Sequence, residues 1–291
     1  MKRFSVGRLL ITAYVVAFIV YMIAPLMVMG GAAINDSRFP SIYPWMGLTL
    51  RWFVELFHDG QMWLAVIRSL LVALAVVAIS VPVGTAAALV INSAQARFRA
   101  VLYGIMVAPI LTPGAVIGIA TILFWNRLHV SAGLHLSVLG QASFISAYAM
   151  LLVLARMQSL DPALEEAALD LGASHGQVMR RIIIPHLKPA FAAAAVIAFF
   201  QSVENFNVTL FTAGNTQTLT VYVFSQVRAG ITPKINALAL LMIAMSLMGA
   251  AAYGNGRRRA AQRLRAEQET ATEDEVVGAR SVAPMAGQQL A

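Results

Sequence analysis

The sequence contains no cysteine and few charged residues, and each shortage narrows what the chain can do. Without cysteine, disulfide bonds, thiolate metal sites and cysteine nucleophiles are excluded. Charged residues make up 12% of the 291 residues, which is about half of their usual share in soluble domains. Hydrophobic residues make up 59%, more than a water-soluble fold of this length could bury. We therefore expect the lipid bilayer to be the main solvent of this chain.

A nucleotide-binding motif is also missing. The pattern G-x-x-x-x-G-K-[ST] occurs nowhere, so the chain is not expected to bind ATP through a P-loop. The histidines have no metal-ligand spacing. We therefore expect no cofactor or metal in this chain and no enzymatic activity. The net charge of +8 does not indicate nucleic-acid binding, because most basic residues border hydrophobic runs, where membrane topology explains them better.

Long uncharged runs are the main feature of what is present. A helix needs about 20 apolar residues to cross the hydrocarbon core of a membrane. The runs predict an all-α membrane protein with six transmembrane helices, at roughly 9–31, 69–92, 101–125, 137–156, 189–211 and 236–254. The first run is longer than the apolar part of a signal peptide, so we expect it to be retained. Residues 109–114 contain two prolines and are expected to unwind the third span.

Lysine and arginine are unevenly divided between the two sides of these spans. Of the twenty that lie near the spans, fourteen are on one side and six on the other, and the richer side is expected to face the cytoplasm. This places both termini, and the loop between spans four and five, on the cytoplasmic side of the membrane. Residues 1–255 are expected to form the transmembrane domain. Residues 256–291 begin basic, turn acidic and have no apolar face, which predicts a largely disordered cytoplasmic tail.

The loop between spans four and five contains an unusually polar segment, residues 165–189, which we call the polar segment. A helix start precedes it at Asp161-Pro162. Gly172 can end this helix in a left-handed conformation, and Ser174 begins a second helix with a capping box. Pro185 is expected to limit that second helix. Simple connectors in helical bundles usually have about 2–8 residues, so this helix–turn–helix is better suited to dock on a soluble partner.

The polar segment also carries a family signature. The pattern E-A-A-x3-G-x9-I-x-L-P is typical of permease subunits of binding-protein-dependent ABC importers, and here only Ile184 departs from it, in place of leucine. The chain resembles this family, which implies that the segment docks in a cleft of a separate ATPase. The residues that the resemblance assigns to this coupling are Glu166, Ala167, Ala168, Gly172, Ala173, Ser174, Ile182 and Pro185.

The resemblance implies a set of partners. The chain would be a multi-pass protein of a bacterial inner membrane and would form half of a type I importer pore with a second permease subunit. A dimer of ATP-binding cassette ATPases would hold ATP and Mg²⁺, and a periplasmic solute-binding protein would deliver the solute. Membrane lipid surrounds such a complex, and nucleic acid has no part in it. The alternatives are a secondary transporter, which needs no ATPase, and a membrane anchor or scaffold, which moves nothing. The signature of the polar segment argues against both.

Two further stretches resemble spermidine/putrescine permeases of the second-subunit type. Residues 35–39 (NDSRF) resemble their N/S-S-R-F segment, and residues 227–238 (VRAGITPKINAL) resemble the stretch before their last span. The similarity covers most of residues 5–255. Related permeases carry opines, iron chelates or aminoethylphosphonate, so the solute stays open, with a small cation favoured.

Glu204 is the acidic residue that lies within a predicted span. Entering from Pro189, it is about two-thirds of the way across the core, where an ionisable group is costly and often functional. Gln201, Glu204 and Asn205 have the spacing of one helix face, so we expect them to line the substrate path, where a carboxylate suits a cation. Related polyamine permeases often carry two adjacent acids here, and this chain has one. Alternatively, Glu204 pairs with Arg68 or with the partner permease, or reaches the outer water.

Overall fold

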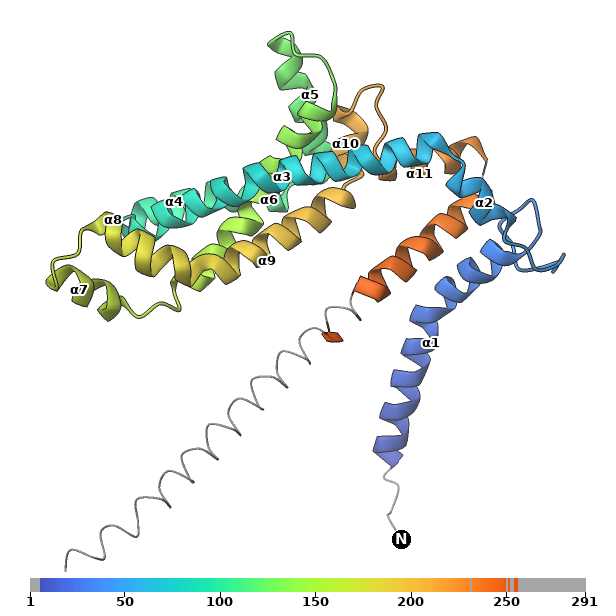
Figure 1. The fold of residues 1–291 in the computed structure, drawn as a ribbon, viewed down its shortest axis with the longest axis horizontal. Coiled ribbons are helices and arrows are strands. Elements are labelled where there is room, and N and C mark those ends of the chain that lie inside the picture. Colours follow the sequence, from blue (N-terminus) through green and yellow to red (C-terminus); the bar gives the residue numbers. More distant parts are fainter. Residues whose placement is uncertain (1–5, 231, 250, 252–253, 256–291) are drawn as a thin grey trace, which may run out of the picture. The chain divides into compact units, whose positions relative to one another are not determined.

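The computed structural model describes residues 6–230, 232–249, 251 and 254–255 (Figure 1). Every regular element in this part of the chain is a helix, apart from an isolated β-bridge between Asn35 and Leu48. The prediction of an all-α fold is confirmed. The predicted tail, residues 256–291, lies outside the described residues.

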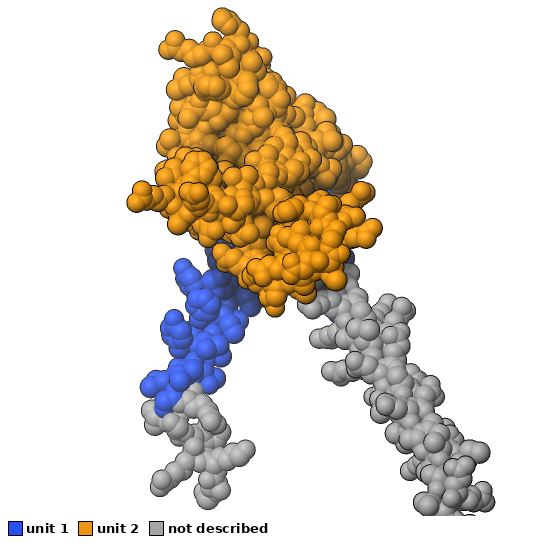
Figure 2. All heavy atoms as spheres, turned by 90° about the vertical axis from the view of Figure 1, so that its left-hand side faces the viewer, with its two compact units in different colours: residues 1–53, 233–291 blue, residues 54–232 orange. Residues whose placement is uncertain are grey.

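The chain divides into two compact units, Met1–Phe53 with Pro233–Ala291 and Val54–Thr232 (Figure 2). The first unit holds α1 (Val6–Ile34) and the helix Pro233–Gly249. Most of α1 exposes apolar side chains. In a membrane such a surface faces lipid tails or an apolar partner.

The loop after α1 is organised by a buried asparagine. Asn35 Nδ2 donates to the carbonyl oxygens of Ser41 (2.8 Å) and Pro44 (3.1 Å). Its Oδ1 accepts from the N–H of Met46 (2.8 Å), and the indole of Trp52 donates to its carbonyl oxygen (2.9 Å). Because a buried amide without partners is costly, these bonds hold the loop in one folded form. These bonds are a structural reason for an asparagine at the first position of residues 35–39.

The second unit is built on three long helices, α3 (Gly60–Ser93), α6 (Leu134–Met157) and α9 (Ile184–Val203), which pack side by side (Figure 1). The shorter α2 (Arg51–Phe57) precedes α3. The predicted spans 69–92 and 137–156 therefore fall within single continuous helices.

The third predicted span, 101–125, is broken into α4 (Ala96–Leu111) and α5 (Gly114–Arg127), which meet at an angle of 105°. Pro113 causes the break because it lacks an N–H, and because its ring drives the preceding residue out of the helical region. Thr112 accordingly has extended backbone angles. The predicted unwinding is confirmed.

The prediction that Pro185 limits a separate second helix is wrong. α8 (His175–Val178) continues through a π-helical turn, Met179–Ile183, directly into α9. A π turn bonds each N–H to the carbonyl five residues earlier, as the N–H of Ile184 does to Met179. Such a turn accommodates a proline that follows it, since the ladder of ordinary α bonds is already interrupted there.

The predicted fifth span, 189–211, ends earlier than expected. α9 stops at Val203, and after a short connection α10 (Asn207–Thr212) begins as a separate helix. The face proposed for Gln201, Glu204 and Asn205 is therefore not a continuous helix face.

Four helices of the described part are long and apolar enough to cross a membrane, and the bent pair α4 and α5 would make a fifth. The predicted sixth span, 236–254, falls on the helix Pro233–Gly249, and its last part includes residues outside the described ones. The count of six spans stays a prediction.

Gly84 allows α3 and α6 to approach closely. A Cβ atom at this position would lie 2.5 Å from the carbonyl oxygen of Ser146 and 2.7 Å from the backbone nitrogen of Met150. Both contacts are with backbone atoms, which cannot move without displacing the helix. Small residues at helix interfaces allow this close packing in membranes, where burial from water contributes little.

We therefore expect Gly84→Ala to destabilise the protein by about 1–3 kcal/mol, the usual cost of overpacking, or to prevent its folding. The matched control is Gly104→Ala, because Gly104 is also helical but has no atom within 4 Å of a built Cβ. Thermal unfolding of the purified protein in detergent measures both. Equal melting temperatures for the two variants would contradict this account of the α3–α6 contact.

Candidate functional site

The first helix of the predicted helix–turn–helix begins as the sequence indicates. α7 (Pro162–Asp170) starts with Pro162 in its first turn, and the Asp161 carboxylate accepts from the N–H of Ala163 (3.0 Å). This cap satisfies one of the N–H groups that a helix start leaves open. Glu165 lies in the first turn, where the helix dipole favours a negative charge.

The turn after α7 also follows the prediction. Gly172 has a φ of +84°, the left-handed region that favours glycine. The N–H of Ala173 donates to Ala168 (3.0 Å), which closes the end of α7. Ser174 and Gln177 then form the capping box, with the Ser174 N–H donating to Gln177 Oε1 (2.8 Å) and the Gln177 N–H donating to Ser174 Oγ (3.4 Å).

Residues 172–176 (GASHG) also fit the pattern G-x-S-x-G of hydrolase nucleophiles. That motif needs a strand before the serine, so that the hydroxyl is exposed on a sharp strand-to-helix turn. Here α7 precedes the serine, and Ser174 Oγ accepts a bond as a helix cap. The structure therefore gives this serine a capping role in place of the nucleophile geometry.

One side of the polar segment rests on the helix bundle. Val178, Ile183 and Leu187 are buried in a core with the ends of α3 and α6. Three of the predicted coupling residues pack against this core while partly buried, namely Ala168, Ala173 and Ile182. The segment is thus attached firmly to the long helices.

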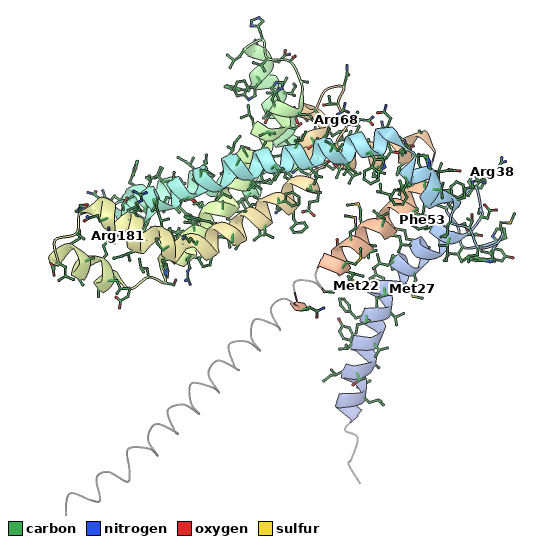
Figure 3. The ribbon with its side chains drawn as sticks, in the orientation of Figure 1. Met22, Met27, Arg38, Phe53, Arg68 and Arg181 are labelled. Carbon is green, nitrogen blue, oxygen red and sulfur yellow. The ribbon has the colours of Figure 1, made fainter. Side chains whose placement is uncertain are left out.

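The opposite side of the polar segment is open. Leu164 is 54% exposed and Leu171 is 89% exposed, although both are apolar. The other predicted coupling residues are exposed as well, namely Glu166, Ala167, Gly172, Ser174 and Pro185. This side of the segment therefore presents apolar side chains among acidic and small residues. Arg181 lies in this region, far along the bundle from Arg68 (Figure 3).

A second attachment joins the ends of α6 and α9. Arg156 Nε donates to the carbonyl oxygen of His186 (3.1 Å), and His186 Nε2 donates to the carbonyl oxygen of Arg156 (3.1 Å). Ser159 Oγ donates to the same Arg156 oxygen (2.7 Å). Arg156 and His186 are 30 residues apart, so sequence spacing could not have indicated this pair.

The predicted substrate-path residues occupy the other end of α9. Gln201 lies in the last turn, Glu204 follows the helix as its C-cap with an exposed side chain, and Asn205 lies in the connection to α10. Asn205 Oδ1 accepts from the N–H of Val208 (3.1 Å) and so begins α10. No salt bridge joins Glu204 to Arg68 within the described residues. Pairing with Arg68 is therefore not what holds Glu204.

A buried polar network lies beside Glu204 and was not indicated by the sequence. Gln141 of α6 accepts from Ser202 Oγ of α9 (2.5 Å) and donates to Thr209 Oγ1 of α10 (2.8 Å). Ser137 and Thr212 share a further bond (2.9 Å). All five side chains are buried. Because isolated polar groups are costly in an apolar interior, this network fixes α10 against α6 and α9.

α11 (Leu219–Ala229) is fastened to the start of α3. The Tyr222 hydroxyl donates to Asp59 Oδ2 (2.6 Å), and the N–H of Leu219 donates to Ser69 Oγ (2.8 Å). Burial, and then the bond to the Asp59 carboxylate, raise the pKa of Tyr222 far above its usual value. The phenol therefore stays protonated and keeps donating throughout the physiological pH range.

Within the part of the chain that the structure describes, no group of three or more histidine, cysteine, aspartate or glutamate residues is arranged to hold a metal ion. The candidate sites are two surfaces at opposite ends of the continuous helix His175–Val203, which α8 and α9 form together. One is the polar segment, and the other is the end of α9 with its polar network.

Comparison with known proteins gives relatives of nearly the same length. The chain is 27% identical over 244 residues to the spermidine/putrescine transport system permease protein PotC of Escherichia coli (strain K12), covering 84% of this chain and 92% of PotC. It is 31% identical over 255 residues to the putrescine transport system permease protein PotI of the same organism, covering 84% of this chain and 90% of PotI.

Solved structures share the fold. A chain of a bacterial ABC transporter that imports the acidic polysaccharide alginate matches with a TM-score of 0.68 and 19% identity, over 86% of this chain and 95% of that one. A chain of an amino acid ABC transporter matches with a TM-score of 0.53 and 21% identity, over 72% of this chain and 100% of that one. The family model of the binding-protein-dependent transport system inner membrane component matches residues 80–265, and the chain belongs to this family.

Proposed function

We propose that this inner-membrane permease forms half of the pore of an ABC importer for a small cation of the spermidine or putrescine class. A second permease subunit completes the pore, a separate ATPase dimer with ATP and Mg²⁺ drives it, and a periplasmic binding protein delivers the solute. Both termini and the polar segment face the cytoplasm. The observation that carries the proposal is the capped helix–turn–helix at residues 161–178, exposed on one side and packed on the bundle on the other.

The packing of the polar segment supports its role as the contact with the ATPase. Its exposed leucines and small residues offer a partner close approach, while its buried side chains connect it to α3, α6 and α9. A force on the exposed side is therefore transmitted to the bundle. A membrane anchor or scaffold would have no use for such a tightly specified joint.

The choice of a cationic solute rests on the named relatives and on Glu204. Both relatives are polyamine permeases by name, and Glu204 is exposed where α9 ends. A carboxylate there compensates part of the cost of dehydrating an ammonium group. Gln201 remains next to it on the last turn of α9, and Asn205 supports the site by holding the start of α10. Opines, aminoethylphosphonate and iron chelates are the competing solutes.

Three predictions test this proposal, and the first concerns coupling to the ATPase. Gly172→Val introduces a β-branched side chain where φ is +84°, a region that such residues avoid. We expect normal membrane insertion, and a loss of most of the ATPase stimulation that the loaded binding protein causes in reconstituted vesicles. Gly176→Val is the matched control, because a Cβ at either glycine meets no atom within 4 Å and only Gly172 has a positive φ. Equal stimulation in the two variants would refute the role of the left-handed joint.

The second prediction concerns the solute. Glu204→Gln keeps the shape of the side chain and removes its charge, so uptake of labelled spermidine by cells that express the whole transporter should fall at least tenfold. Glu204→Asp should restore much of the uptake, because the charge returns. Pull-down of the partner subunits verifies assembly. Normal uptake in Glu204→Gln would exclude a role for the charge, and loss of assembly would instead indicate a structural role.

The third prediction concerns orientation in the membrane. Cysteine labelling can test it, because the native chain has no cysteine. Tyr43 is 88% exposed and Leu171 is 89% exposed, so a cysteine at either position is open to reagents. In intact cells with a permeable outer membrane, an impermeant maleimide should label Tyr43→Cys and leave Leu171→Cys unlabelled. Labelling of both positions in the detergent-purified permease, freed of its ATPase, is the control, because the proposed ATPase contact covers Leu171 in the whole transporter. The opposite pattern would invert the proposed topology.

A further inference from the structure

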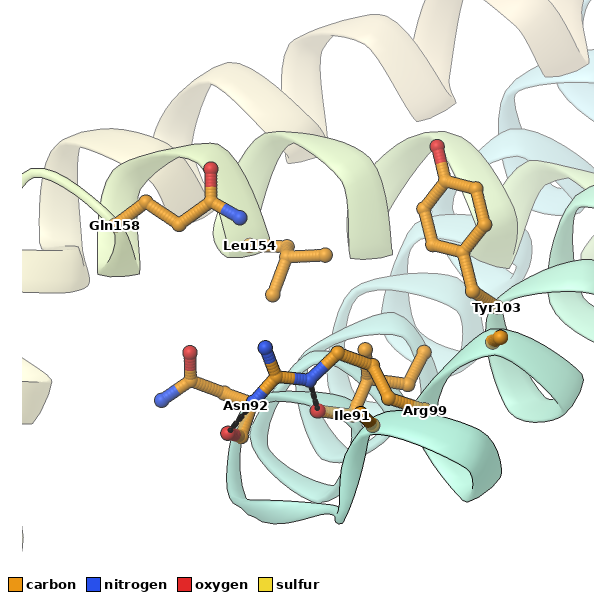
Figure 4. A pocket seen from close by; sticks show the side chains of 8 residues that line it. Ile91, Asn92, Arg99, Tyr103, Leu154 and Gln158 are labelled. Carbon is orange, nitrogen blue, oxygen red and sulfur yellow. Dashed lines mark hydrogen bonds between the residues drawn. The ribbon is translucent and has the colours of Figure 1, made fainter.

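A pocket of about 340 Å³ lies where α3 ends, α4 begins and α6 ends (Figure 4). Three polar side chains line it, namely Asn92 from the end of α3, Arg99 from the start of α4 and Gln158 just after α6. Among the described residues that line it, none is acidic. The pocket is therefore suited to an anionic group.

The polar and apolar parts of this pocket lie at different depths along the helices. Asn92 and Gln158 are at the ends of helices, whereas Ile91 and Leu154 lie one to four residues back along the same long apolar stretches and are buried. Tyr103 contributes a ring one turn further along α4 than Arg99. Because α3 and α6 are candidate membrane spans, the polar rim lies at the boundary between hydrocarbon and water.

The Arg99 guanidinium is held in place. Its Nε donates to the carbonyl oxygen of Ile91 (3.1 Å) and its Nη2 to that of Asn92 (2.9 Å). These bonds satisfy carbonyl groups that the end of α3 leaves open. Figure 4 shows the remaining nitrogen turned away from these carbonyls, toward the side of the pocket where Leu154 and Gln158 lie. A positioned cation thus has donors left for a ligand.

The face of α4 turned away from this pocket is apolar. Phe98, Val101 and Ile105 are 59%, 57% and 63% exposed. Next to a membrane boundary, such side chains contact acyl chains, while arginine and tyrosine side chains lie at the level of the headgroups. In the pocket itself, Ile91, Leu154 and the Tyr103 ring supply the apolar part beside the polar groups, a combination that suits a phospholipid.

We propose that the pocket binds the phosphate group of a membrane phospholipid. Arg99 provides the charge, since guanidinium and phosphate form strong charge-assisted hydrogen bonds. The amides of Asn92 and Gln158 supply further donors, and the Tyr103 ring packs beside the glycerol and upper acyl region. A neighbouring cavity shares Asn92 and Gln158 and is lined by Glu165 of α7. The bound headgroup therefore lies next to the polar segment.

The test is native mass spectrometry of the assembled transporter, released from nanodiscs that contain equal amounts of phosphatidylethanolamine and phosphatidylglycerol. The wild type should retain phospholipid during stepwise delipidation. Arg99→Gln should lower the retained fraction about tenfold, as expected for loss of a hydrogen bond to a charged group. Arg97→Gln is the matched control. It removes the same charge only two residues away, and the Arg97 side chain does not line the pocket. If both variants lost the same fraction of phospholipid, unspecific surface charge would explain the binding, and the proposal would be overturned.

Arg99 also caps α3, so a second variant separates binding from folding. Ala100→Trp fills the pocket and leaves every charge in place, and it should release phospholipid as Arg99→Gln does. Retention of phospholipid in Ala100→Trp would contradict the proposed site. A titration with inorganic phosphate tests the other source of the same chemistry. Thermal stabilisation by phosphate in the wild type but not in Arg99→Gln, without any retained phospholipid, would likewise overturn the assignment to a lipid.

Discussion

Close contact between helix backbones is the constraint on which the second unit depends. Lipid gives helices little reason to associate by burial alone, so van der Waals packing and hydrogen bonds must hold them together. Gly84 provides this contact between α3 and α6, and Gly118 of α5 provides it against the backbone of Val208 in α10, while Gly140 makes room for the Val208 side chain. Larger residues at these positions would separate the helices, and the bonds between α6, α9 and α10 would no longer form.

The two candidate sites follow from this packing in different ways. The polar segment depends on local caps, which act within a few residues of Asp161 and Ser174. The region of Glu204 depends on bonds between residues far apart in sequence, above all those of Gln141 with Ser202 and Thr209. The turn of the first site therefore takes its shape mainly from its own sequence, whereas the second site depends mainly on the arrangement of the bundle.

This difference explains which predictions could be made from the sequence. The all-α fold, the cap at Asp161, the turn at Gly172 and the break before Pro113 each have a strong local signal, and the structure confirms them. The end of α9 at Val203 was not predicted because, apart from Glu204, the chain stays uncharged beyond it, although Asn205, which begins α10, is a local signal of a helix start. The continuation of α8 into α9 was missed for a related reason, since a π turn can carry a helix past a proline.

The uninterrupted path from α8 through α9 has a mechanical consequence. Its 29 residues, His175–Val203, make a rod of about 43 Å at 1.5 Å per residue. A helix resists compression, so a displacement imposed at one end must emerge at the other as a tilt or an axial shift. The π turn at Met179–Ile183 is the one stretch of this rod that departs from the α hydrogen-bond pattern. Under the proposed function, a force on the polar segment would thus reach the far end of α9 without a chain of rearranging side chains.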